Sequence, residues 1–220
     1  MIKNNIADIR KKIATAAKIS HRPPDAITLI AVGKNHGIDK IQKAYAHGIN
    51  NFGENKLQEA MAKFIDPSFR EKIILHFIGH LQSNKVKKAV QFFDYIHSLD
   101  RESLATQLAK EKNNWQLQKP FPKLLIEVNF GEESQKSGVV SKHLPDFFYH
   151  CKNELDLPIV GLMAILPFDM PAAPFFASLK KQSEELNLLE TSMGMTNDYQ
   201  PAIELGASMV RIGTGIFGER

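Results

Sequence analysis

Cysteine is almost absent from this sequence, which contains a single residue of that type, Cys151. One thiol cannot form an intramolecular disulfide, and it cannot by itself assemble a cysteine-based zinc site. We therefore expect no disulfide and no metal centre. The scarcity of cysteine also favours a reducing compartment, the cytoplasm.

Long apolar runs are missing as well. Every apolar run is well short of the roughly 18 residues that a membrane span requires, although 43% of the 220 residues are hydrophobic. We therefore expect a soluble globular protein with no membrane partner. The first twenty residues have helical spacing, with Ile2, Ile6, Ile9 and Ile13 three or four positions apart. A transit peptide has a similar pattern, but a helix packed on the domain is the simpler interpretation.

The sequence also has no concentrated basic segment. The net charge is +4 and the isoelectric point is near 9.0, but the Lys and Arg residues are scattered and aromatic residues do not interleave with them. Nucleic acid is therefore not an expected partner. No linker, low-complexity tract or change of composition divides the chain, so residues 1–220 are predicted to form one domain.

A regular alternation of strand and helix patterns runs along the chain. Eight short apolar runs predict strands at Ile27–Val32, Ile49–Phe52, Ile73–Ile78, Tyr95–Leu99, Leu124–Val128, Ile159–Ile165, Leu188–Ser192 and Met209–Ile212. Continuous apolar strands separated by helical patterns indicate a parallel sheet that is covered on both faces. Eight such units favour a single (β/α)8 barrel of the TIM type with an extra N-terminal helix. A doubly wound open sheet is the structural alternative.

Most of the residues at or just beyond the predicted strand ends are polar. In a (β/α)8 barrel the functional face is built from the carboxyl ends of the strands and the loops that follow them. The residues at these places are Lys34, Asn55, His80, Ser98, Asn129, Met163, Ser192 and Arg211. Strand ends also lie near water, so the pattern alone does not define a site.

The last two strand ends carry the features of a phosphate site. The segments are Ser192-Met193-Gly194-Met195 and Arg211-Ile212-Gly213-Thr214-Gly215. Hydroxyl groups, a guanidinium and glycines that allow close backbone approach all suit a phosphate dianion. Barrels often hold phosphate after their seventh and eighth strands.

Lys34 is the other singular residue, because it follows the first strand directly. A partly desolvated position near other cations favours the neutral amine, which is the form that makes Schiff bases. A solvated lysine at a strand end is the alternative.

Several segments of the sequence resemble the pyridoxal phosphate homeostasis proteins, the YggS/PROSC family. They are Leu29–Lys34, Phe52–Asn55, His76–Lys85, Gly161–Ala164, Ser192–Met195 and Met209–Thr214. The resemblance extends along nearly the whole chain and implies a fold similar to the barrel domain of alanine racemase. It implies pyridoxal 5′-phosphate as the cofactor.

The resemblance also implies a role for each site residue. Lys34 would form the Schiff base with the cofactor, Asn55 would lie beside its ring, Arg211 would face its pyridine nitrogen, Ser192, Gly194, Gly213 and Thr214 would hold its phosphate, and Met193 would line the pocket. The segment Asn35-His36-Gly37 departs from the family, where Thr and Pro are more usual, so the shape of the first loop is open.

Two further residues near these segments have alternative interpretations. His36 is expected to be a solvated loop histidine, with an acid or base beside the Schiff base as the alternative. Lys136 is either a second amine that reacts with aldehydes or a surface lysine.

The implied position of Arg211 argues against an amino-acid enzyme. A permanent positive charge opposes protonation of the pyridine ring and makes it a weaker electron sink. Racemisation also needs a second base, which alanine racemase obtains from a further domain and a dimer partner that are not expected here.

We therefore predict a monomeric, non-catalytic protein that binds and buffers pyridoxal phosphate. It would maintain vitamin B6 and amino-acid and keto-acid pools, with apo-enzymes as candidate recipients of the cofactor. The alternatives are a monomeric pyridoxal-phosphate racemase and a sugar-phosphate enzyme in which Lys34 forms a Schiff base with its substrate.

Overall fold

The apolar runs become parallel strands in the computed structural model, which describes residues 1–131, 137–166 and 171–219. The main strands are β1 (Thr28–Val32), β2 (Asn51–Glu54), β3 (Ile74–Phe77), β4 (Tyr95–Leu99), β5 (Lys123–Asn129), β7 (Ile159–Met163), β8 (Glu190–Ser192) and β9 (Met209–Ile212). A short additional strand, β6 (Val139–Val140), was not predicted and pairs with β5.

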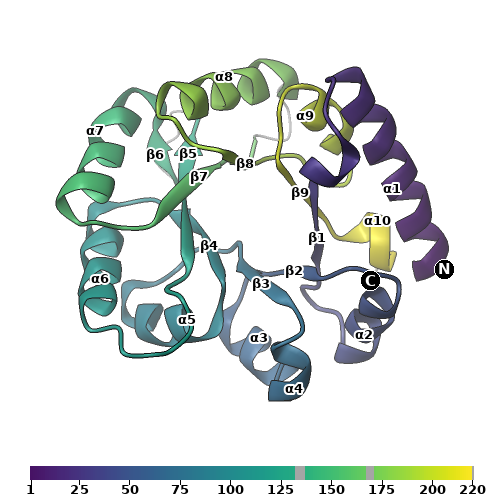
Figure 1. Ribbon diagram of the computed structural model, residues 1–220, viewed down its shortest axis with the longest axis horizontal. Coiled ribbons are helices and arrows are strands. Elements are labelled where there is room, and N and C mark those ends of the chain that lie inside the picture. The colour runs from purple at the N-terminus through teal and green to yellow at the C-terminus, as the bar shows by residue number, and fades with distance from the viewer. Residues whose placement is uncertain (132–136, 167–170, 220) are drawn as a thin grey trace.

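The strands close into a barrel. Their order is β4-β3-β2-β1-β9-β8-β7-β5, and pairing of β4 with β5 completes the ring. Every pair is parallel, as strands joined by helical crossovers require. Figure 1 looks down this ring, with the helices outside it. The predicted (β/α)8 barrel is confirmed, and the open sheet is excluded.

Two strands, β2 and β7, end two residues away from their predicted carboxyl ends. β2 begins at Asn51 and extends to Glu54, because Gly53 and Glu54 pair with His76 and Phe77 of β3. β7 ends at Met163, and residues 164–166 do not continue the strand. Both differences concern the carboxyl ends of strands, where the site is expected.

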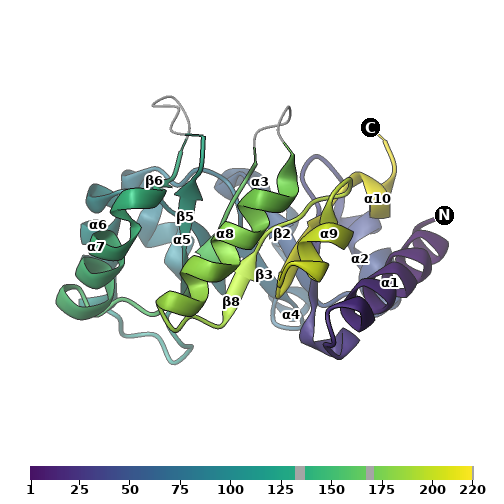
Figure 2. The ribbon, with the colours of Figure 1, turned by 90° about the horizontal axis from the view of Figure 1, so that it is seen from above.

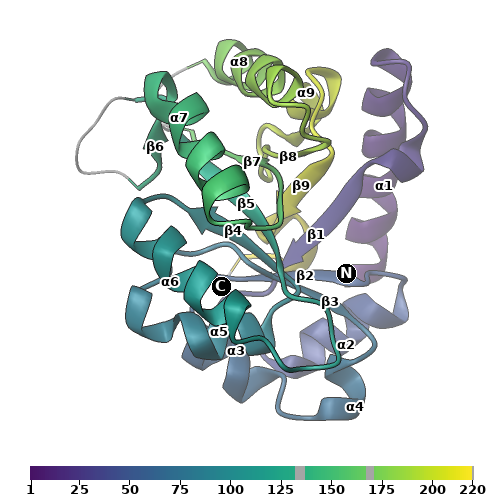
Figure 3. The same ribbon diagram turned by 60° about the vertical axis from the view of Figure 1, so that its left-hand side comes forward.

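Helices form the outer layer of the barrel, which Figure 3 shows from another side. They are α1 (Ile2–Ile19), α2 (Ile38–Ala46), α3 (Leu57–Lys63), α4 (Pro67–Arg70), α5 (Val86–Phe92), α6 (Glu102–Asn113), α7 (Leu144–Tyr149), α8 (Ala172–Glu185), α9 (Tyr199–Glu204) and α10 (Thr214–Phe217). The short helices α4, α9 and α10 were not predicted. α7 continues as a wider turn at His150–Glu154.

The N-terminal helix α1 is part of the packed body, as predicted. Its apolar face buries Ile6, Ile9 and Ile13, and the helix lies against α2, α9 and α10 (Figure 2). Arg10 Nη2 donates to the Gly48 carbonyl after α2 at 2.7 Å, and Asn5 Nδ2 donates to a carbonyl of α10 at 2.9 Å. None of the helices in the described ranges is long and apolar enough to cross a membrane.

Candidate functional site

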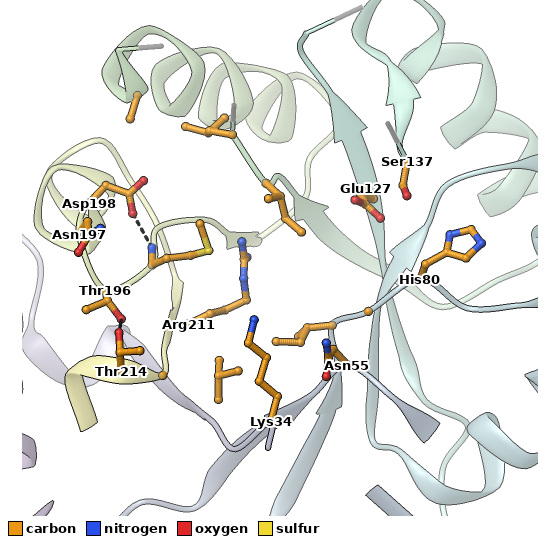
Figure 4. A pocket seen from close by; sticks show the side chains of 18 residues that line it. Lys34, Asn55, His80, Glu127, Ser137, Thr196, Asn197, Asp198, Arg211 and Thr214 are labelled. Atoms are coloured by element: carbon orange, nitrogen blue, oxygen red, sulfur yellow. Dashed lines mark hydrogen bonds between the residues drawn. The ribbon is translucent and has the colours of Figure 1, made fainter. Parts of the chain in front are cut away.

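A cavity of about 800 Å³ opens at the carboxyl ends of the strands. Five of the predicted site residues line it, namely Lys34, Asn55, Arg211, Gly213 and Thr214. They come from the ends of β1, β2 and β9 and from the start of α10, which are neighbours in the barrel. Figure 4 shows the side chain of Lys34 extending into this space toward Arg211.

The turn that carries Lys34 is held by a buried ion pair between Lys63 and Glu54. Lys63 Nζ lies 2.6 Å from Glu54 Oε1 and also donates to the Gly33 carbonyl at 2.6 Å. Burial raises the pKa of Glu54 to about 7, and the hydrogen bond from Lys63 acts in the opposite direction. A side chain at Gly33 would place its Cβ 2.6 Å from Ile41 Cδ1 and 2.9 Å from Glu54 Oε1, so these two side chains would have to shift.

The loop after Lys34 has a defined shape in spite of its unusual sequence. Asn35 adopts φ 63°, a left-handed conformation that asparagine tolerates better than most residues, and its N–H donates to Glu59 Oε1 at 2.6 Å. His36 was predicted to be solvated, and this was wrong. Its exposure is only 9%, because its ring packs against Phe217 of α10 with centroids 5.0 Å apart.

Asn55 lines the cavity and carries an unsatisfied polar atom. Its Oδ1 is buried and has no hydrogen-bond partner within the described residues. The backbone of Asn55 runs so close to Gly79 that a Cβ there would lie 2.1 Å from the Asn55 carbonyl oxygen. A buried amide oxygen without a partner costs about 1–3 kcal/mol, which a ligand could recover. Asn55 is therefore placed to hydrogen-bond a molecule in the cavity.

Arg211 is a buried cation beside Lys34. It is 4% exposed, its Nη1 donates to Ser192 Oγ at 2.6 Å, and its Nη2 donates to the Ala164 carbonyl at 2.8 Å. Burial lowers the pKa of Arg211 to about 10, so the guanidinium stays charged at neutral pH. A guanidinium has five N–H donors, so these two bonds leave others for a ligand.

A chain of buried hydrogen bonds continues from Arg211 through the barrel interior. Ser192 Oγ lies 3.0 Å from His97 Nδ1, His97 Nε2 lies 3.0 Å from His76 Nδ1, and His76 Nε2 lies 3.0 Å from Asn51 Oδ1. Arg211 can only donate and Asn51 Oδ1 can only accept, so each imidazole between them carries its proton on Nε2. We call these five residues the interior relay.

Both histidines of the interior relay are uncharged at neutral pH. Burial lowers the pKa of His76 to about 3, with a smaller effect from the positive charge of Arg70. Burial also holds the pKa of His97 well below its usual value, and His76 and Arg211 add to this effect. The relay thus fixes the orientation of Arg211 without adding a second charge.

The wall of the cavity formed by Thr196 and the start of α10 offers hydroxyl and backbone groups. Thr214 Oγ1 donates to Thr196 Oγ1 at 3.3 Å, and both residues line the cavity. Thr214 begins α10, whose first backbone N–H groups have no partner within the helix. Asp198 shapes the adjoining turn by accepting the Met195 N–H at 2.6 Å. This wall suits a phosphate group.

Some predicted residues do not line the cavity. Ser192 and Met193 are fully buried, and the Gly194 carbonyl accepts the Arg211 N–H at 3.0 Å. Of the remaining strand-end residues, His80 lines the cavity, whereas Ser98, Asn129 and Met163 do not. Lys136 lies outside the described residues. In the part of the chain that the structure describes, no group of His, Cys, Asp or Glu could hold a metal ion.

Sequence reasoning missed several residues of the cavity. Thr196 and its neighbours follow Gly194 by only a few positions. Extending the predicted phosphate segment beyond Met195 would have included them. Glu127 lies within β5 and is 7% exposed. Burial raises its pKa to about 7, Asp100 adds to the shift and Arg211 opposes it. A single charged residue inside an apolar strand was the available signal.

The chain matches a known family over almost its whole length. The model described as "Alanine racemase, N-terminal domain" matches residues 2–220. A curated relative from Pasteurella multocida is 37% identical, covers 100% of this chain and 97% of its own length, and is described as "Pyridoxal phosphate homeostasis protein". A relative from Escherichia coli K12 with the same description is 36% identical, again over 100% of this chain.

Solved structures show the same relationship. PipY of Synechococcus elongatus with PLP bound has a TM-score of 0.80 at 34% identity, covering 99% of this chain and 100% of PipY. The PipY structure without PLP has a TM-score of 0.85. Alanine racemase from Corynebacterium glutamicum has a TM-score of 0.62 at 18% identity, and the match covers 60% of that chain. The last similarity shows the fold alone.

Proposed function

Because the chain belongs to the family of pyridoxal phosphate homeostasis proteins, we propose that it binds pyridoxal 5′-phosphate and buffers it within the cell. The observation that carries this proposal is that Lys34, Arg211 and Thr214 line one cavity of about 800 Å³. An amine, a guanidinium and a hydroxyl beside a helix start are complementary to a small phosphorylated aldehyde. The cavity lies within the usual range for small-molecule sites, roughly 300–1,000 Å³.

The residues present fit this cofactor. When bound, the cofactor supplies an aldehyde that combines reversibly with a primary amine. We assign that amine to Lys34, which is the lysine that lines the cavity within the described residues. Asn55, whose amide oxygen has no partner there, would hydrogen-bond the ring substituents. Arg211 would donate to the pyridine nitrogen.

The phosphate assignment follows the wall formed by Thr196 and α10. Gly213, Thr214 and Thr196 line the cavity, and the first N–H groups of α10 face outward from the helix start. Ser192 and Gly194 would act from behind this wall, because they hold Arg211 through its side chain and its backbone N–H. Met193 would support the same loop from the core.

We propose a carrier and not an enzyme. A charged Arg211 facing the pyridine nitrogen would oppose its protonation, which weakens the ring as an electron sink. The curated relatives from Pasteurella multocida and Escherichia coli carry a homeostasis description as well. Every residue assigned above comes from one chain, so we also propose that a monomer suffices and that apo-enzymes are the recipients.

The test is to trap the cofactor on the protein chemically. Protein loaded with pyridoxal phosphate is reduced with borohydride, digested and mapped, and we expect the label on the peptide containing Lys34. Lys34→Ala should lose the visible absorption band and the trapped label while it keeps weaker binding through the phosphate wall. Lys43→Ala, a change of an exposed lysine on α2, is the matched control and should behave as the wild type.

Two results would contradict the proposal. Label on another peptide, including the one containing Lys136, would assign the amine elsewhere. Exchange of the α-proton of an amino acid by the loaded protein, measured in deuterated water, would show an enzyme of the racemase type.

A further inference from the structure

Glu127 is a largely buried carboxyl at the cavity. It lines the cavity with 7% exposure, and within the described residues it has no hydrogen-bond or ion-pair partner. Its neighbour Asp100 differs, because Arg101 Nη1 lies 2.5 Å and His80 Nδ1 3.3 Å from its carboxylate oxygens. The Glu127 oxygens are not among the fully enclosed unpartnered atoms of the described residues, so they are open to the cavity, where a ligand can bind them.

The position of Glu127 separates it from the cofactor groups. β5, which carries Glu127, lies across the barrel from β1 and β9, which carry Lys34 and Arg211. Figure 4 shows Glu127 on the side of the cavity away from Thr196 and Thr214, with Lys34 and Arg211 between them. The cavity therefore has a wall suited to anions and an acidic wall opposite to it.

The volume leaves room for a second small molecule. A cavity of about 800 Å³ is near the upper end of the usual range for one drug-sized ligand, roughly 300–1,000 Å³. Asp100 adds negative charge near Glu127 without a direct contact between them. Such a field attracts a cation, and the cation that fits beside a carboxyl in a small space is an ammonium group.

We propose that Glu127 binds the ammonium group of a small primary amine, which enters the acidic side of the cavity while the cofactor occupies the other side. This inference rests on the proposed function, since the amine would exchange with Lys34 for the aldehyde. The ammonium group would give up a proton, its nitrogen would form a C=N bond to the aldehyde carbon as the bond to Lys34 Nζ breaks, and Lys34 would leave as the protonated amine. It assigns a second ligand class to the cavity, and Glu127 is its binding residue.

The ionisation of Glu127 supports this assignment. Burial raises its pKa to about 7, so a large fraction of the carboxyl is neutral at neutral pH in the absence of a partner. An ammonium ion beside it would favour the carboxylate. Within the described residues, Arg211 and Asp100 are the charged groups that act on Glu127, and they oppose each other.

The test compares a charged amine with an uncharged one. Loaded protein is exposed to methylamine, which is an ammonium ion at neutral pH, or to hydroxylamine, which is largely uncharged, and loss of the bound cofactor is followed by its absorption. We expect the half-saturating methylamine concentration to rise about tenfold or more in Glu127→Gln, because one charge-assisted hydrogen bond is lost. The response to hydroxylamine should stay within about twofold of the wild type. Glu154→Gln, a change of an exposed carboxyl, is the matched control.

A second measurement does not depend on bound cofactor. The Glu127 carboxyl carbon is followed by NMR in unloaded protein, and methylamine should lower the pH at which it ionises. Equal methylamine responses in wild type and Glu127→Gln, with Lys34 still labelled by borohydride, would overturn the amine site and leave the proposed function intact. Absence of any bound cofactor in the wild type would overturn the proposed function itself.

Discussion

The interior relay explains how one arginine is held in a fixed orientation inside an apolar barrel. A buried guanidinium is costly unless its hydrogen bonds are satisfied. Ser192 and the Ala164 carbonyl accept hydrogen bonds from Arg211. The two histidines continue the chain of hydrogen bonds from Ser192 to the side-chain oxygen of Asn51. Because both imidazoles are neutral, the relay stabilises the cation without repelling it.

Acid should break this arrangement. The pKa of His76 is lowered to about 3 in the folded protein, whereas an unfolded histidine titrates near 6.5. The unfolded state therefore binds more protons below pH 6.5, and stability is lost as the pH falls from there toward 3. As the pH falls through this range, we expect the free energy of unfolding to decrease by up to about 1.4 kcal/mol per pH unit for each histidine of the relay.

Two measurements check this prediction. Nitrogen-15 NMR should show both histidines neutral with the proton on Nε2 at pH 5.5, with exposed His21 and His143 in the same spectra as references. Urea unfolding at several pH values should show a shallower loss below pH 6.5 in His76→Gln than in the wild type. Charged imidazoles in the folded state, or an unchanged slope in His76→Gln, would contradict the prediction.

Residues of the site were predictable where the chemistry follows a strand end directly. Lys34, Asn55 and Arg211 met this condition, and they line the cavity. Ser192 was also at a strand end, but its side chain points into the interior relay, which only the three-dimensional pairing with His97 reveals. Glu127 lies inside a strand, and its place at the cavity depends on neighbours far away in sequence.

At the scale of elements, the long periodic segments were predictable and the short ones were not. α1 follows helical hydrophobic spacing over 18 residues, so its position was clear from sequence. α10 covers only Thr214–Phe217, which is too short to establish a period. β6 forms because Val139 and Val140 meet the end of β5, a tertiary contact with little local signal.

The N-terminal helix offers a direct test of packing. Ile13 on α1 is 4% exposed, and its replacement by alanine should lower the free energy of unfolding by about 2–5 kcal/mol through lost burial and a residual cavity. Lys12→Ala on the exposed face of the same helix should change it by less than about 0.5 kcal/mol. Urea denaturation measures both. Equal effects would show that α1 does not pack as described.

At the scale of the whole molecule, the site lies where separate strands meet. Lys34 follows β1, Asn55 follows β2 and Arg211 belongs to β9, and these three strands are neighbours in the closed ring. A ligand that contacts all three adds links between elements that are far apart in sequence. Binding in the cavity is thus coupled to the stability of the entire barrel, because a closed ring cannot lose one strand pair independently.

This coupling predicts the thermal behaviour of the protein. A ligand at about 100 times its dissociation constant stabilises the folded state by about 2.7 kcal/mol, which is roughly 5–11 °C in Tm for a domain of this size. Calorimetry should therefore show one transition that shifts upward with pyridoxal phosphate. Lys34→Ala should reduce the shift at the same concentration, whereas Lys43→Ala should not. Two separate transitions would contradict a single cooperative barrel, and an unchanged Tm would contradict binding that links β1, β2 and β9.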